Sequence, residues 1–174
     1  VIEKGSTGFL GIKSKPAIIK ARKKNDTVDN IREFLENVFS AMNMEVTIDI
    51  KKAEDDKVYE VELSGKEMGL LIGKRGQTLD SLQYLTNLAV NKHSDGYIKV
   101  KLDTEDYRQR RKDTLENLAK NIAYKVKRTK RPVSLEPMNP FERRVIHSAL
   151  QGDRYVETHS EGEEPFRHVV VTLK

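Results

Sequence analysis

The 174-residue chain carries 32 Lys and Arg residues against 27 Asp and Glu, and its net charge of +5 favours a polyanionic partner. The absence of cysteine excludes disulfides, thiolate metal sites and cysteine nucleophiles. The sequence shows no signal peptide and no apolar run near the roughly 20 residues of a membrane span, so a soluble, cytoplasmic protein without a transmembrane segment is expected.

The first 24 residues place three glycines, at positions 5, 8 and 11, between two short β-prone pieces and then run into Lys and Arg. This pattern is typical of the end of a small domain followed by a basic linker, and equally of a disordered basic tail. The first residue is Val rather than Met, which indicates a fragment of a longer chain.

Residues 27–43 show the apolar spacing of an amphipathic helix, with Asp26 or Thr27 available as N-cap. Strict alternation of apolar and polar residues over 46–50 and 59–63, separated by a turn-like segment, predicts an antiparallel hairpin.

Next come a helix-length piece at 67–72, the sequence GKRG, and a longer helix. One side of that helix is expected to be apolar and to carry Leu79, Leu82, Leu85, Leu88 and Ala89. An alternating strand over 98–102 follows. The predicted order from Thr27 to Asp103 is therefore α-β-β-α-α-β.

A long helix with a high density of basic residues is expected to begin at Asp103 or Thr104 and to end before Pro132. Its apolar seam is predicted to contain Tyr107, Leu115, Leu118, Ile122 and Val126. Most of its Lys and Arg residues lie off that seam.

A second helix start is well specified, because Asn139 can cap, Pro140 suits the first helical position and Glu142 can complete a capping box. This helix should end near Gly152. Two β-prone stretches, 155–160 and 166–173, then predict a final hairpin.

The sequence Gly73–Gly76 carries the main functional signal. Glycine at both ends lets a sugar–phosphate backbone approach closely, while Lys74 and Arg75 supply positive charge beside a helix N-terminus. Ile72 and Leu79 are expected to form the apolar floor of an adjacent groove in which bases lie. The α-β-β-α-α-β order around this loop resembles the type II KH domain, and the resemblance implies single-stranded RNA held across about four nucleotides.

A nucleotide-binding P-loop is the rival interpretation of this loop. It fails because the spacing from Gly69 to Gly73 is one residue too short and Arg75 replaces the hydroxyl that would hold magnesium. The sequence also shows no nucleophile, no acid/base pair and no histidine spacing typical of a metal site. We therefore expect no enzyme, no catalytic residues, no cofactor and no metal.

Arg143 and His147 lie four residues apart and should share one helix face, with Arg144 adding charge. Arg167 opens the last strand and is expected to converge on the same surface, extending the RNA track. If its imidazole is unperturbed, titration of His147 is expected to weaken binding above pH ~6.5. The plainer interpretation of this spacing is a solvent-facing helix surface.

The run from Met138 to Leu150, together with 160–168, resembles the domain named for its Arg-x-x-x-His motif, a family associated with single-stranded nucleic acid. With the KH-like segment and Gly8–Ile12, the whole chain resembles the bacterial Jag family. The resemblance implies an α+β architecture with three parts: the tail of a Jag-type N-terminal domain and a linker (1–24), a type II KH domain (25–103) and a small α+β Arg-x-x-x-His domain (104–174).

The Jag resemblance further implies a bacterial cytoplasmic protein that binds single-stranded RNA or single-stranded DNA. It implies an RNA chaperone or post-transcriptional regulator linked to cell-envelope homeostasis, cell shape and cell wall biogenesis. Its implied protein partner is a small paralogous KH protein, or a second copy in a dimer. The alternative hypothesis is an interaction module in which the KH-like part dimerises and GKRG is only a turn.

Overall fold

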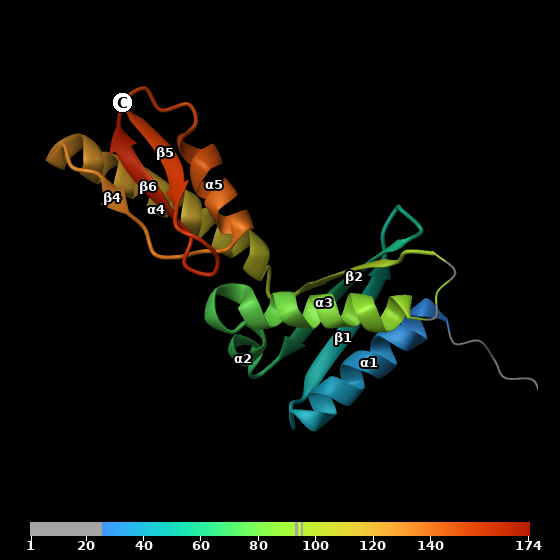
Figure 1. The fold of residues 1–174 in the computed structure, drawn as a ribbon. Helices are drawn as coiled ribbons and strands as arrows, with labels where there is room; N and C mark the ends of the chain where they lie inside the picture. Colours follow the sequence, from blue (N-terminus) through green and yellow to red (C-terminus); the bar gives the residue numbers. More distant parts are fainter. Residues whose placement is uncertain (1–25, 93, 95) are drawn as a thin grey trace, which may run out of the picture.

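The computed structural model describes residues 26–92, 94 and 96–174, and Figure 1 shows their arrangement. The predicted N-terminal tail, including Gly8–Ile12, and His93 lie outside the described residues. Two separate hydrophobic cores divide the rest into an N-terminal unit (residues 26–103) and a C-terminal unit (residues 104–174).

The N-terminal unit has the predicted α-β-β-α-α-β order. It contains α1 (Thr27–Ala41), β1 (Val46–Lys52), β2 (Val58–Gly65), α2 (Met68–Ile72), the 3₁₀ turn η2 (Lys74–Gly76), α3 (Gln77–Asn91) and β3 (Lys99–Asp103). β2 lies at the centre of the sheet, antiparallel to β1 and parallel to β3. The inward side chains of the strands pack against α1 and α3 to form the first core.

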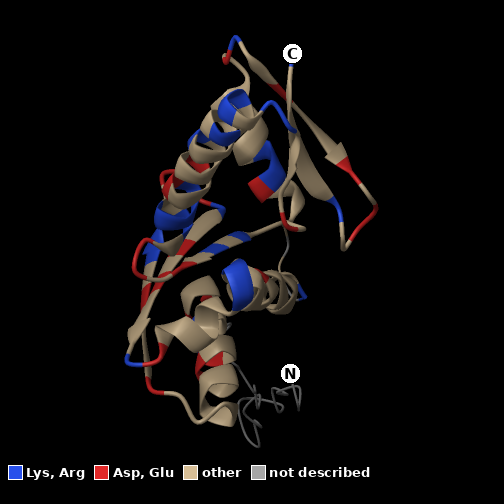
Figure 2. Cartoon of the chain, turned by 90° about the vertical axis from the view of Figure 1, so that its left-hand side faces the viewer, with Lys and Arg blue, Asp and Glu red and all other residues tan. Residues whose placement is uncertain are grey.

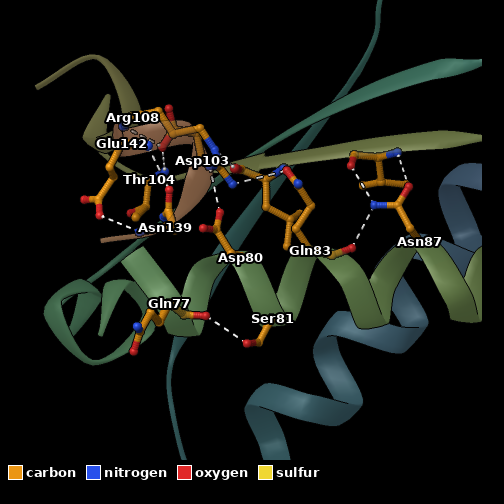
Figure 3. Close-up of polar contacts among 12 residues, drawn as sticks. Gln77, Asp80, Ser81, Gln83, Asn87, Asp103, Thr104, Arg108, Asn139 and Glu142 are labelled. Carbon is orange, nitrogen blue, oxygen red and sulfur yellow. Dashed lines mark hydrogen bonds and ion pairs between the residues drawn. The ribbon is translucent and has the colours of Figure 1, made fainter. Parts of the chain in front are cut away.

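The outer edge of β3 is covered by amide side chains from α3 (Figure 3). Asn87 accepts a hydrogen bond from the Val100 N–H and donates one to the Val100 carbonyl, both at 2.8 Å. Asn91 bonds Ile98 in the same way, and Gln83 accepts from the Leu102 N–H at 2.9 Å. These side chains fix α3 against the sheet and thereby position the loop at its N-terminus.

The apolar side of α3 differs from the prediction. Leu79 and Leu82 are buried, but Leu85 and Leu88 are about half exposed, at 50% and 53%. The helix therefore turns only part of its apolar surface toward the core, and a second apolar stripe faces outward.

The C-terminal unit packs α4 (Tyr107–Thr129) and α5 (Pro140–Leu150) against a three-stranded antiparallel sheet. The sheet consists of β4 (Val133–Ser134), β5 (Val156–Glu161) and β6 (His168–Leu173), with β6 in the centre. The predicted capping box at Asn139 and Glu142 and the predicted final hairpin are confirmed. The short strand β4 was not predicted.

The long helix α4 starts later than predicted. Glu105 and Asp106 adopt left-handed backbone conformations, so the helix begins at Tyr107. Its buried face also uses small residues, Ala119 and Ala123, while Leu118 of the predicted seam is partly exposed. The alanines let α4 lie close to the elements that surround it in the second core, because larger side chains would hold it away.

Candidate nucleic-acid interface

The backbone of the Gly73–Gly76 loop depends on its two glycines. Gly73 and Gly76 have φ angles of +66° and +81°, in the left-handed region that disfavours other residues. A Cβ at Gly73 would collide with the Thr78 side chain, and one at Gly76 would lie 2.7 Å from Cε1 of Tyr107. The loop can therefore approach both α3 and α4 only with glycine at these positions.

The second glycine also leaves the N-terminus of α3 without a capping side chain. Gly76 is the N-cap, and no side chain of a described residue caps the first N–H groups of this 15-residue helix. Lys74 is exposed beside it and forms no ion pair with any residue that the structure describes. An exposed ammonium next to uncapped amides forms a corner suited to a phosphate group.

Arg75 does not share this corner, although the sequence predicted that it would. Its guanidinium reaches the C-terminal unit, where it donates to the Pro137 carbonyl at 2.6 Å and pairs with the Glu136 carboxylate. The Arg75 side chain is only 28% exposed. It therefore links the two units in this conformation, and Lys74 alone presents its charge at the loop.

The two predicted groove residues lie in different environments. Ile72 is half-buried at the end of α2, whereas Leu79 is completely buried in the first core. Leu79 therefore supports the loop from beneath but offers no surface to a base in this conformation. Only Ile72 can contribute to an apolar floor.

The Arg-x-x-x-His pair points into the C-terminal unit. Arg143 is only 9% exposed, and it donates to the Met138 carbonyl at 2.7 Å and to Glu164 at 2.6 Å. Its guanidinium therefore fastens α5 to the loop between β5 and β6. Arg144, the next residue, is exposed.

His147 lies against β5 and is partly buried. Its Nδ1 is 2.7 Å from the Thr158 hydroxyl, and its Nε2 is 2.9 Å from the Ser160 hydroxyl. Burial, with smaller contributions from Arg143 and His159, lowers the pKa of His147 below its usual 6.5. The imidazole is therefore neutral at pH 7, and the expectation of an unperturbed titration is wrong.

Arg167 is also engaged locally. Its guanidinium donates to the Gly162 carbonyl at 3.1 Å and to the Ser160 carbonyl at 3.4 Å. These bonds brace the turn between β5 and β6. Of the predicted C-terminal site residues, only Arg144 presents its charge to solvent without a hydrogen-bond or ion-pair partner among the described residues.

Five of the eight basic residues of α4 pair with carboxylates, although Lys and Arg (blue) outnumber Asp and Glu (red) along the helix itself in Figure 2. Arg108 pairs with Asp80 at 2.8 Å, joining α4 to α3 (Figure 3), and Arg111 pairs with the buried Glu142 at 2.5 Å. Lys127 pairs with Asp153 at 2.5 Å. Much of the positive charge of α4 therefore joins this helix to neighbouring segments.

Family models match the chain in three parts. The model described as "Jag N-terminus" matches residues 1–23, "KhpA/KhpB, KH domain" matches 29–102, and the model of the Arg-x-x-x-His domain matches 113–173. The chain is 68% identical over 174 residues to RNA-binding protein KhpB of Clostridium symbiosum, covering all of this chain and 78% of the relative. The chain belongs to the Jag family.

Two further relatives carry the same name. RNA-binding protein KhpB of Bacillus subtilis is 40% identical over 177 residues, covering all of this chain and 84% of the relative. That of Lactiplantibacillus plantarum is 37% identical, covering 91% of this chain and 49% of the relative. The N-terminal unit is accordingly the KH domain of a Jag-family protein, the C-terminal unit is its Arg-x-x-x-His domain, and the predicted α+β class is confirmed.

Sequence reasoning missed two residues that shape the interface of this Jag-family chain. Glu136 pairs with Arg75 across the two domains, and Phe166 is 72% exposed on the β5–β6 turn. Glu136 lies in an irregular segment without periodicity, so no local pattern marks it. Phe166 could have been noticed as the aromatic residue beside Pro165, but an apolar residue at a strand start usually indicates core.

No group of three or more His, Asp or Glu side chains within the described ranges is arranged to hold a metal ion. Among the same residues, no helix is both long enough and apolar enough to cross a membrane.

Proposed function

We propose that this chain binds single-stranded RNA, or single-stranded DNA, by clamping the nucleic-acid backbone at Gly73–Gly76. The carrying observation is the exposed Lys74, which has no ion-pair partner among the described residues and lies beside the uncapped N-terminus of α3, in a loop whose geometry requires glycines. The matching family models of the two domains and the names of the relatives support RNA as the ligand. The proposal describes a cytoplasmic binding protein rather than an enzyme.

We also propose a separate role in RNA binding for each of the two domains. Residues 25–103 would hold the strand as the KH domain and residues 104–174 would extend the binding surface as the Arg-x-x-x-His domain, with 1–24 as the tail of the N-terminal domain. Ile72 would contact a base, and the exposed Arg144 would add attraction. Arg143, His147 and Arg167 would act by shaping the C-terminal domain, because their polar atoms already have protein partners.

The test is the affinity for a fluorescent single-stranded RNA pool with Lys74→Glu, compared with Lys57→Glu. Both lysines are exposed in the KH domain, but Lys57 lies at the β1–β2 turn, away from the loop (Figure 1). Losing a charge-assisted bond costs about 1.5–3 kcal/mol, so Lys74→Glu should weaken binding about tenfold to a hundredfold. The slope of log affinity against log salt should fall by about 0.7. Equal effects of the two changes would refute the clamp.

A biological role follows from the same proposal. We propose that RNA binding serves an RNA chaperone or post-transcriptional function linked to cell-envelope homeostasis, as the Jag-family relationship suggests. Cross-linking in cells followed by sequencing should recover transcripts enriched in envelope genes from the wild type and lose them with Lys74→Glu.

The exposed apolar face of α3 supports the proposal of a protein partner. Tyr84, Leu85 and Leu88 are 65%, 50% and 53% exposed and lie on one helix face. We propose that another KH domain covers this face, either in a small paralogous KH protein or in a second copy. Sedimentation equilibrium should show that Leu85→Asp lowers the association of the partners, whereas Leu118→Asp on α4 leaves it unchanged.

A further inference from the structure

A cleft lies where the RNA-clamping loop faces the Arg-x-x-x-His domain. Its volume is ≈ 410 Å³, within the range of ~300–1,000 Å³ typical of small-ligand sites. Lys74, Arg75 and Gln77 line one side, and residues 136–140 and 164–166 line the other. Figure 1 shows the β5–β6 turn approaching the start of α3, which places this cleft directly beside the clamp.

The carboxylates of this cleft do not repel a nucleic acid as strongly as their number suggests, because each is paired with arginine. Glu136 pairs with Arg75, Glu142 with Arg111, and Glu164 with Arg143. These three pairs leave the ammonium of Lys74 as the unbalanced charge of the cleft lining. A phosphate entering from the clamp is therefore attracted rather than excluded.

Phe166 presents an aromatic ring to this cleft from a well-braced turn. The ring is 72% exposed, although burial of an aromatic side chain would normally be favourable. The Phe166 N–H donates to the Glu163 carbonyl at 2.8 Å, and the Arg167 guanidinium holds the Gly162 carbonyl on the same turn. Arg143 holds Glu164 from the α5 side. The turn is thus fixed by its own bonds while the ring remains open.

We propose that Phe166 is a stacking platform for a nucleobase that lies just outside the nucleotides clamped by Gly73–Gly76. A KH clamp spans about four nucleotides, so a longer strand must leave the loop, and the cleft begins at the loop residues themselves. An exposed aromatic ring on a braced turn can stack any base, since every base has a π-face. The site is composite: the KH domain holds the phosphates and the Arg-x-x-x-His domain holds the base. This inference rests on the proposed RNA binding.

The first test compares a tetranucleotide with an octanucleotide of the same repeating sequence, using the full chain. Stacking on one aromatic residue is worth about 1–3 kcal/mol, so Phe166→Ala should weaken octamer binding about 5- to 150-fold and leave tetramer binding unchanged. Phe166→Tyr should keep wild-type affinity. The control is Tyr155→Ala, because Tyr155 is also exposed, at 64%, but lies against Lys127 in another part of the C-terminal domain.

A second test uses the absence of tryptophan from the chain. Phe166→Trp introduces a single fluorophore, which the octamer should quench by stacking and the tetramer should not. Tyr155→Trp should respond to neither. Unchanged octamer affinity in Phe166→Ala, or unquenched Trp fluorescence in Phe166→Trp, overturns the platform.

The two proposals fail in distinguishable ways. If the RNA clamp itself is wrong, Lys74→Glu will not weaken tetramer binding. If only the platform is wrong, Lys74→Glu will weaken binding of both oligonucleotides, while Phe166→Ala will affect neither or both equally.

Discussion

The Gly73–Gly76 loop and the Arg-x-x-x-His motif both place basic side chains on helical segments, yet they use those side chains differently. In the KH loop, Lys74 is exposed and lies between two glycines whose positive φ angles other residues rarely adopt. In the C-terminal domain, Arg143 and His147 bond to the surrounding strands and turns. A motif recognised by spacing can thus either form a binding surface or build the scaffold beneath one.

The comparison predicts that Arg143→Ala lowers stability more than the other changes considered below. The change removes bonds to Met138 and Glu164 and leaves a buried carbonyl unpaired, which should lower the free energy of unfolding by about 1.5–3 kcal/mol. Arg144→Ala is the matched control and should stay within about 0.5 kcal/mol. Urea unfolding followed by circular dichroism measures both. Equal stabilities would return Arg143 to the binding surface.

A comparable loss is expected in the KH loop from Gly76→Ala. A side chain at φ +81° is strained and would meet Tyr107, so the free energy of unfolding should fall by about 1–3 kcal/mol. Gly69→Ala in α2 is the control, since a Cβ there meets nothing and alanine favours a helix by about 0.5–1 kcal/mol. Thermal melting should move the two variants in opposite directions. If both melt alike, glycine is not required by the loop geometry.

A smaller effect concerns the contact that joins the two regions. Glu136→Gln removes the carboxylate that holds Arg75 and should free the guanidinium for phosphate. Because partly exposed pairs contribute about 0.2–1 kcal/mol, we expect RNA binding to tighten by about 1.4- to 5-fold in a fluorescence titration. Glu163→Gln removes the same charge from the β5–β6 turn and serves as control. Weaker binding by Glu136→Gln would mean that the pair organises the site instead of competing with RNA.

The smallest effect is expected from pH. The pKa of His147 is lowered in the folded protein, so the unfolded chain binds the proton more readily. The contribution of His147 to stability is therefore complete above pH ~6.5 and declines as the pH falls below that value. His147→Gln should flatten the dependence of unfolding free energy on pH between about 7 and 5. An unchanged profile would show that His147 does not carry this linkage.

The order of elements could be predicted because periodicity and capping act locally. The two hairpins required only alternation and turn signals, and Asn139 with Glu142 marked the start of α5. The start of α4 could not be predicted, since Glu105 and Asp106 are good first-turn residues that the tertiary structure forces into left-handed conformations. The exposure of Leu85 and Leu88 could not be predicted either, because periodicity does not distinguish an apolar helix face that packs on the core from one that stays exposed.

Of the candidate site, only the Gly73–Gly76 loop could be predicted from the sequence. Spacing identified the loop, but the direction of Arg75 depends on Glu136, which is 61 residues away. The cleft beside Phe166 likewise forms from segments that only the tertiary structure brings together. Contacts of this kind leave no periodic trace in the sequence.

The amide side chains along β3 have a consequence for how molecules of this protein meet. An exposed strand edge offers a row of unpaired N–H and C=O groups to a neighbouring molecule, and such edges promote aggregation. At β3, this row of groups is bonded by the amide side chains of Gln83, Asn87 and Asn91. At β1, the Arg32 guanidinium donates to the Ile48 carbonyl at 3.1 Å. The KH sheet therefore resists edge-to-edge growth at β3.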